Sequence, residues 1–341
     1  MGIKKMILFR ADANKEIGTG HVMRCLSIAK GFNAKGEKVL FITADHNGDE
    51  LIKQNGFQSL CLESNWKAMD DEIDIIKYHL SQMHPSILVV DSYFVTQKYF
   101  SEISNVVKVV YIDDFNKEMW NVDTLINYNI YSQSLDYSIY NDTRTELILS
   151  PKYAPLRDEF KSYPPHNIKK VTDVMVSAGG SDPQKITERL MNNVCDNYPD
   201  IDFHFIVGAL NPRLDTIKNI SQNKANIVLH INEKNMSALM NKCDIAISAA
   251  GTTLYELCAC GIPTITYTLA DNQLMAAEQF SNKEIMLSVG DCRNDDSFIS
   301  RVEKALCNLV EDMELRKTMS NRMHSLVDGN GVERIIEKLL K

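Results

Sequence analysis

Short apolar runs alternate with helical segments along the whole chain, and this alternation restricts the fold more than any other feature. Residues 6–10 and 38–43 have the composition of buried strands, and each run is followed by residues with helical spacing. Strands that alternate with helices predict βαβ units and a parallel sheet. The pattern starts again at residues 171–177, so the 341 residues predict an α/β protein with two Rossmann-like domains and a cleft between them.

The domain boundaries follow from where the pattern weakens. We expect an N-terminal domain over residues 1–160 and a C-terminal domain over residues 171–312. Residues 161–170 contain Pro164-Pro165 and have the composition of a linker. Residues 313–341 are predicted to form C-terminal helices, which can pack back on the N-terminal domain.

Composition excludes several classes of protein. The formal net charge is −8 and no run of Lys or Arg occurs, which argues against a nucleic-acid partner. No apolar stretch approaches the roughly 18 residues that a membrane span needs, so we expect no stable membrane insertion. The eight cysteines are scattered, without metal-ligand spacing and without a signal peptide ahead of them, which favours a cytoplasmic protein with no metal. No cofactor is expected, and no oligomer is predicted.

Three glycine turns join a strand to a helix. They contain Gly18 and Gly20; Gly180 and Ser181; and Gly251, Thr252 and Thr253. Backbone N–H groups at such a turn can bind a phosphate, although any tight strand-to-helix connection also needs glycine. None of the turns has the P-loop pattern, and the first lacks the third glycine of the dinucleotide fingerprint. Phosphate binding without NAD is therefore favoured over turn geometry alone.

Two titratable residues stand beside these turns. His21 is predicted at the mouth of the first helix, where the helix dipole favours a neutral imidazole that can act as a general base. The alternative is a helix-entry residue that packs on the sheet. Glu256 follows Thr253 by three residues, and this spacing fits a capping box as well as a carboxylate that binds ribose hydroxyls.

Polar residues gather where predicted strands of the first domain end. Asp12, Tyr93, Asp113 and Asp114 all follow apolar runs. The carboxyl ends of parallel strands are where ligands bind in open α/β sheets. Asp113 and Asp114 are adjacent, so their side chains are expected to point to opposite faces and not to form a metal-binding DxD motif.

Six segments carry a resemblance to a known family. They are ADANKEIGTGHVMRCLSIA, YIDD, KYAPLRDEF, VSAGGSDPQKIT, ISAAGTTLYELCACGIPTI and ADNQ, in this order between about residues 6 and 290. Together they resemble the UDP-2,4-diacetamido-2,4,6-trideoxy-β-L-altropyranose hydrolases of pseudaminic acid biosynthesis. The wider relatives are glycosyltransferases of GT-B fold, including the peptidoglycan UDP-N-acetylglucosaminyltransferase.

The resemblance implies a site for a UDP-linked sugar. His21 matches the catalytic histidine of the family, and Glu256 matches the ribose-binding glutamate. The expected sugar contacts are Arg10, Asp12, Gly20, Tyr93 and Asn272. The expected UDP contacts are Gly18, Arg157, Gly180, Ser181, Gly251, Thr252, Thr253 and Glu256. The C-terminal domain is expected to hold most of the UDP.

The resemblance also implies the reaction. Water would attack C1 of the sugar, the C–O bond would break with inversion, and UDP would leave without a metal. A UDP-sugar glycosyltransferase on the same fold is the alternative, and a nucleotide-sugar binding protein without catalysis is the third hypothesis. For the latter, a histidine in the sugar-facing loop would be unneeded.

Overall fold

The computed structural model describes residues 4–164, 166, 170–180, 182–208, 211–293 and 295–341. The chain divides into two compact units. The first contains the chain up to Leu156 together with Asn330–Lys341, and the second contains Arg157–Gly329. The N-terminal part of the first unit thus ends at Leu156, and the described residues of the expected linker (161–164, 166 and 170) lie in the second unit.

The first unit is a seven-stranded parallel sheet with the order β3-β2-β1-β4-β5-β6-β7. Its strands are β1 (Met6–Ala11), β2 (Lys38–Thr43), β3 (Ser59–Cys61), β4 (Ile87–Asp91), β5 (Lys108–Ile112), β6 (Thr124–Asn127) and β7 (Glu146–Leu149). Its helices are α1 (Gly20–Ala34), α2 (Asp49–Gln54), α3 (Ile73–Met83), α4 (Gln97–Ile103) and α12 (Gly331–Leu339). The strand order reverses between β1 and β4, which makes this pair the switch point where ligands bind in such sheets.

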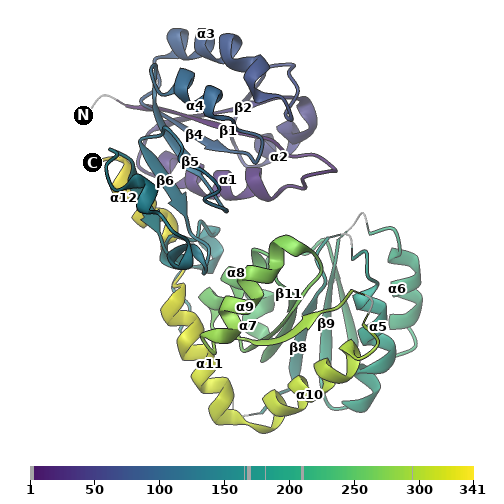
Figure 1. Ribbon diagram of the computed structural model, residues 1–341. Helices are drawn as coiled ribbons and strands as arrows, with labels where there is room; N and C mark the ends of the chain where they lie inside the picture. Colours follow the sequence, from purple (N-terminus) through teal and green to yellow (C-terminus); the bar gives the residue numbers. More distant parts are fainter. Residues whose placement is uncertain (1–3, 165, 167–169, 181, 209–210, 294) are drawn as a thin grey trace. The chain divides into compact units, whose positions relative to one another are not determined.

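Helices cover both faces of this sheet (Figure 1). On one face, Leu8 and Leu88 pack in a core with residues of α3 and α4. On the other face, Phe9 stacks on Phe41 and meets Phe32 of α1 edge-on. Because both faces are buried, the central strands are almost continuously apolar, which is why they were visible in the sequence.

The second unit is a six-stranded parallel sheet with the order β10-β9-β8-β11-β12-β13. Its strands are β8 (Asp173–Ser177), β9 (Asp202–Val207), β10 (Ile227–Ile231), β11 (Ile245–Ala249), β12 (Thr264–Thr268) and β13 (Leu287–Asp291). Its helices are α5 (Ile186–Asn193), α6 (Leu214–Ser221), α7 (Met236–Lys242), α8 (Thr253–Cys260), α9 (Leu274–Asn282), α10 (Phe298–Glu311) and α11 (Met313–Leu326). The switch point of this sheet lies between β8 and β11.

The region of residues 125–150 has no clear periodic pattern in the sequence. The structure nevertheless has two parallel strands in this part of the chain, β6 and β7. Each strand has only four residues. Four residues are too few to show a periodic pattern, so pairing with β5 rather than local sequence defines this edge of the sheet.

The C-terminal helix α12 belongs to the first unit, whereas the preceding helix α11 belongs to the second. Val332 and Ile336 of α12 pack directly against Gly31 of α1, where a Cβ atom would overlap Val332. Figure 1 shows this last helix, in yellow, beside elements from the first half of the chain. The absence of a side chain at Gly31 is what lets the two helices approach so closely.

Truncation of the α12 contact should destabilise the first unit. Ile336 is fully buried, so Ile336→Ala is expected to lower its free energy of unfolding by about 2–4 kcal/mol. Both tryptophans, Trp66 and Trp120, lie in this unit, so tryptophan fluorescence during urea denaturation reports on it alone. Exposed Ile75 of the same unit supplies the control Ile75→Ala, which should change little. Equal effects of the two substitutions would contradict the packing role of α12.

Candidate functional site

The loop between β1 and α1 presents His21 at the switch point of the first sheet. Asn14 and Gly18 pair through both backbone N–H groups, and Gly18 has a φ of +71°, which favours glycine. Gly20 is the first residue of α1, so His21 lies on the first turn of the helix. The predicted position of His21 at a helix entry is therefore what the structure shows.

His21 forms a hydrogen-bonded pair with Asp91, the last residue of β4. The distance between His21 Nδ1 and Asp91 Oδ1 is 2.6 Å, and only 1% of Asp91 is exposed. Asp91 is ionised because Arg24 pairs with it, so it accepts the bond and Nδ1 carries the proton. This tautomer leaves Nε2 as the nitrogen that can take a proton.

Arg24, one helical turn after His21, keeps Asp91 charged. Its Nε and Nη2 atoms donate to the two Asp91 oxygens at 2.5 and 2.6 Å. Burial opposes ionisation of Asp91, but the charge of Arg24 and the hydrogen bonds from Arg24 and His21 outweigh it and hold the pKa of Asp91 well below its usual range. A buried carboxylate with these partners is a fixed anion, and it fixes the orientation of the imidazole.

A second acidic residue extends this network to the surface. Nη1 of Arg24 donates to both oxygens of Asp114 at 3.0 Å, and the Tyr93 hydroxyl donates to Asp114 at 2.7 Å. Burial and the Asp114 carboxylate raise the pKa of Tyr93 well above its usual range, so this hydroxyl stays protonated. The Tyr93 ring meets the His21 ring edge-on at 4.6 Å and is 46% exposed. Tyr93 is therefore the solvent-exposed aromatic side chain next to His21.

Arg10 and Asp12 form a separate buried network. Arg10 makes two parallel bonds to Glu72 at 2.7 and 2.8 Å and a third to Asp12 at 2.5 Å. Asp12 also accepts a bond from the backbone N–H of Ala44 at 2.7 Å. Arg10 is completely buried, so this geometry supports a role in holding the β1 and β2 loops rather than direct contact with a sugar. Its sugar contact stays a prediction.

In the second unit, two glycine turns follow the strands that flank the switch point. β8 pairs with β11 through Ser177 and Ser248, so both turns leave the sheet side by side. Gly180 lies after β8, and a Cβ on Gly208, after β9, would lie 2.9 Å from the Gly180 carbonyl oxygen. The close approach of the two glycine backbones leaves no room for a side chain at Gly208.

The N-terminus of α8 is the more open of the two predicted phosphate sites. Thr252 is its N-cap and makes no side-chain capping bond, while Gly251 and Thr252 are both exposed. The capping box expected as an alternative is therefore wrong, because Glu256 does not cap the helix through Thr253 and bonds elsewhere. An uncapped helix N-terminus leaves backbone N–H groups for an anion.

Backbone N–H groups at the N-terminus of α5 already have a hydrogen-bond acceptor within the protein. This helix starts at Ile186, and the side chain of Asp182 folds back on its first turn. The Asp182 carboxylate accepts bonds from Ile186 N and Thr187 N at 2.8 and 2.9 Å. An internal carboxylate takes the place of an external phosphate on these two N–H groups. Ser181 lies outside the described residues.

Glu256 bonds to Arg157 at the start of the second unit. The distance from Arg157 Nη2 to Glu256 Oε1 is 3.1 Å, and Arg157 also forms an ion pair with Glu159 at 2.5 Å. Burial raises the pKa of Glu256, and Arg157 opposes this shift. The structure thus brings two predicted UDP contacts together, Arg157 and Glu256.

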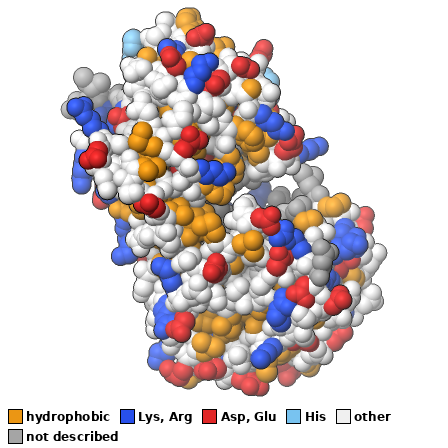
Figure 2. All heavy atoms as spheres, in the orientation of Figure 1, with side chains coloured by type: hydrophobic (Ala, Val, Ile, Leu, Met, Phe, Trp, Pro, Cys, Tyr) orange, Lys and Arg blue, Asp and Glu red, His pale blue; other side chains and the backbone are white. Residues whose placement is uncertain are grey.

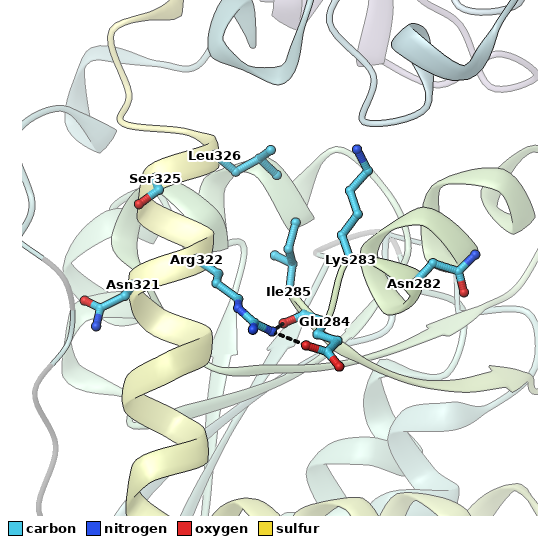
Figure 3. A pocket seen from close by; sticks show the side chains of 8 residues that line it. All are labelled: Asn282, Lys283, Glu284, Ile285, Asn321, Arg322, Ser325 and Leu326. Atoms are coloured by element: carbon cyan, nitrogen blue, oxygen red, sulfur yellow. Dashed lines mark hydrogen bonds and ion pairs between the residues drawn. The ribbon is translucent and has the colours of Figure 1, made fainter.

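The remaining predicted residue of this unit is Asn272. It lies on the exposed single turn Asp271–Gln273 before α9. A pocket of the same unit is lined by residues of α9, α11 and the segment before β13, among them Glu284 and Arg322, and contains none of the predicted site residues (Figure 3). Among the described residues, no group of three or more His, Cys, Asp or Glu side chains is arranged to hold a metal ion.

Surface and helix properties add two observations. On the face shown in Figure 2, acidic and basic side chains are interspersed over both units. Within the part of the chain that the structure describes, no helix combines the length and apolar character that crossing a membrane requires.

Sequence reasoning missed the partners of His21. Neither Asp91, at the end of β4, nor Arg24 of α1 was among the predicted site residues. A signal for Arg24 existed, since an arginine one turn after a helix-entry histidine sits on the face that packs on the sheet. Glu72 had no comparable signal because its partner Arg10 lies 62 residues away in the sequence.

Acid should destabilise the first unit through Asp91. A carboxylate whose pKa is depressed in the folded state contributes stability above its unfolded pKa of about 3.9, and this stability is lost as the pH falls. We expect the free energy of unfolding, followed by tryptophan fluorescence, to fall between about pH 5 and pH 3. The slope should be smaller in Asp91→Asn and unchanged in Asp142→Asn, a control at an exposed position. Equal slopes in all three proteins would exclude Asp91 as the group.

Comparison with known proteins agrees with this architecture. Residues 174–339 match the model of the glycosyltransferase family 28 C-terminal domain. The structure of MurG from Acinetobacter baumannii superposes with a TM-score of 0.70 and 13% identity, over 98% of this chain and 99% of that one. This likeness identifies the two-sheet arrangement as a GT-B fold.

Two curated relatives are similar in sequence. An uncharacterized protein of Methanocaldococcus jannaschii, MJ1062, is 25% identical over 77% of this chain, which spans only 55% of that protein. The UDP-2,4-diacetamido-2,4,6-trideoxy-β-L-altropyranose hydrolase of Campylobacter jejuni is 26% identical, over 73% of this chain and 86% of that protein. The chain is thus a GT-B protein whose residues 174–339 match the glycosyltransferase family 28 C-terminal domain.

Proposed function

We propose that this protein hydrolyses a UDP-linked sugar, with UDP-2,4-diacetamido-2,4,6-trideoxy-β-L-altropyranose as the substrate. The observation that carries the proposal is the His21–Asp91 pair at the switch point of the first sheet. A buried carboxylate that orients a histidine at a ligand-binding edge is an arrangement for general-base catalysis. The likeness to the Campylobacter jejuni hydrolase supports the choice of substrate.

The second unit supplies the nucleotide site in this proposal. The uncapped N-terminus of α8 would bind the diphosphate through the backbone N–H groups of Thr252 and Thr253. The N–H of Gly251 already donates to the Ala249 carbonyl oxygen at 2.8 Å, so Gly251 would contribute close backbone approach and no donor. Glu256 on the same helix would accept hydrogen bonds from the ribose. The turn at Gly180 would give the phosphates room but few hydrogen-bond donors. Two backbone N–H groups of α5 already donate to Asp182.

The reaction needs one base and one good leaving group. His21 Nε2 takes a proton from water as the water oxygen bonds to C1 of the sugar, and the C1–O bond to UDP breaks with inversion. The proton stays on the imidazolium, which the Asp91 carboxylate stabilises across 2.6 Å. UDP leaves as an anion whose terminal phosphate has its second pKa near 6, so it needs little general-acid help at neutral pH. The free sugar would then be available for pseudaminic acid synthesis.

A UDP-sugar glycosyltransferase is the second candidate. The match to the glycosyltransferase family 28 C-terminal domain and the likeness to MurG favour it. In that case His21 would take the proton of an acceptor hydroxyl instead of water. A binding protein without catalysis would give His21 and its buried partners no chemical task.

A panel of UDP-sugars separates the three functions. We expect free sugar and UDP to appear in NMR spectra without any acceptor, at the highest rate with the diacetamido-trideoxy sugar. In ¹⁸O-labelled water, C–O cleavage places the label in the sugar. Label in the phosphate would contradict attack at C1, turnover only with an acceptor would indicate a glycosyltransferase, and binding without turnover would indicate a binding protein.

Replacement of the base should separate binding from chemistry. His21→Ala is expected to lower kcat by about 10²–10⁴-fold, the usual contribution of a general base, and to leave the Kd for UDP nearly unchanged. His46→Ala, at an exposed histidine of the same unit, should turn over normally. Near-full turnover by His21→Ala would remove His21 from the catalytic role.

Turnover should survive a chelator. The proposal stabilises the departing diphosphate by the helix N-terminus of α8 and assigns no step to a metal. We expect the same initial rate with and without EDTA, and no stimulation by added Mg²⁺ or Mn²⁺. A strict requirement for either ion would contradict the proposed mode of diphosphate binding.

A further inference from the structure

The guanidinium of Arg157 is held on three sides by residues of its own unit. It lies over the ring of Phe160, with 5.1 Å between the guanidinium carbon and the ring centroid. Its two terminal nitrogens bond to different carboxylates, Nη1 to Glu159 and Nη2 to Glu256. Arg157 therefore has a fixed position that requires no ligand.

Backbone contacts anchor the segment that carries Arg157. Phe160 is fully buried, and its carbonyl oxygen lies against Gly329, where a Cβ atom would overlap it. Gly329 has a φ of +78°, so a side chain there would be strained as well. Glu159 also accepts a bond from the backbone N–H of Ser237 in α7 at 3.4 Å. The segment that carries Arg157 is thus fixed to the unit independently of α8.

Two carboxylates share the single positive charge of Arg157. The Glu256 side chain is 19% exposed, and its burial raises the pKa of its carboxyl group. Arg157 lowers this pKa, and the neighbouring Glu159 carboxylate raises it. Removal of Arg157 would leave two neighbouring carboxylates without a cation. Glu256 would then be more easily protonated and free to change rotamer.

We propose that Arg157 is a positioning residue that makes the nucleotide site select ribose over 2′-deoxyribose. It holds Glu256 ionised, with Oε1 engaged and Oε2 presented to the ribose 2′-hydroxyl. A site built to hydrogen-bond a hydroxyl rejects the analogue that lacks it, because a half-buried acceptor is left without its donor. The inference rests on the proposed nucleotide site and replaces the expected direct contact of Arg157 with UDP.

The test compares UDP with 2′-deoxy-UDP by isothermal titration calorimetry on the full chain. The wild type should bind UDP more tightly by about tenfold or more, since one such hydrogen bond to a charged group contributes about 1.5–3 kcal/mol. Arg157→Ala should bring the ratio of the two Kd values close to one and leave the Kd for 2′-deoxy-UDP nearly unchanged. Arg157→Lys keeps the positive charge but loses the two-nitrogen geometry of the guanidinium, so it should give an intermediate ratio of Kd values. This variant replaces Arg157→Ala in the test if the alanine variant does not fold.

Arg322→Ala is the matched control. Arg322 pairs with Glu284 at 2.6 Å in the same unit, in the pocket of Figure 3, so the control also removes an arginine from an Arg–Glu pair. Its ratio of Kd values should equal that of the wild type. A general loss of stability would affect the affinity for both nucleotides and would not change the ratio.

Three results would overturn the inference. They are a wild type without preference for UDP, a full preference in Arg157→Ala, and an equal loss of affinity for both nucleotides in that variant, which would indicate direct contact with the diphosphate or base. Glu256→Gln separates the inference from the nucleotide site itself. If Glu256→Gln abolishes the preference and Arg157→Ala does not, the site stands and the role of Arg157 fails. If UDP does not bind to the wild type at all, the proposed nucleotide site fails.

Discussion

The candidate site of the first unit depends on the buried ion pair between the Asp91 carboxylate and Arg24. An isolated carboxylate with 1% exposure would take up a proton, and then it could not hold an imidazole in one tautomer. Arg24 prevents this because its two bonds at 2.5 and 2.6 Å compensate for the lost hydration. The chain therefore has a charged arginine in the face of α1 that packs on the sheet. The orientation of His21 and the packing of α1 depend on the same ion pair.

The two strand-to-helix turns of the second unit show how local chemistry decides a helix N-terminus. In sequence the turns look equivalent, since each combines glycine with hydroxyl residues. In the structure Asp182 fills the N–H groups of α5, whereas Thr252 leaves those of α8 without a side-chain cap. Because a helix N-terminus binds an anion only where its donors are unoccupied, the two turns have different capacities for phosphate.

Most strands of the two sheets could be predicted from the sequence. The exceptions, β6 and β7, have a common cause. β1, β4, β8 and β11 are buried on both faces and so have apolar runs that are visible locally. β6 and β7 have four residues each and form because β5 offers an edge. The candidate site followed the same rule. His21 and Glu256 stand beside glycine turns, so local sequence singles them out, whereas Asp91 is 70 residues from His21 and their pairing depends on strand order.

The sequence by itself determined the class of fold, the two sheets and the helix-entry positions of His21 and Glu256, because periodicity, glycine turns and helix starts are local properties. Only the tertiary structure decided which groups those residues meet. It paired His21 with Asp91, Glu256 with Arg157 and Asp182 with its own helix. The charge, tautomer and orientation of a side chain depend on neighbours that are distant in the sequence, so local patterns cannot specify them.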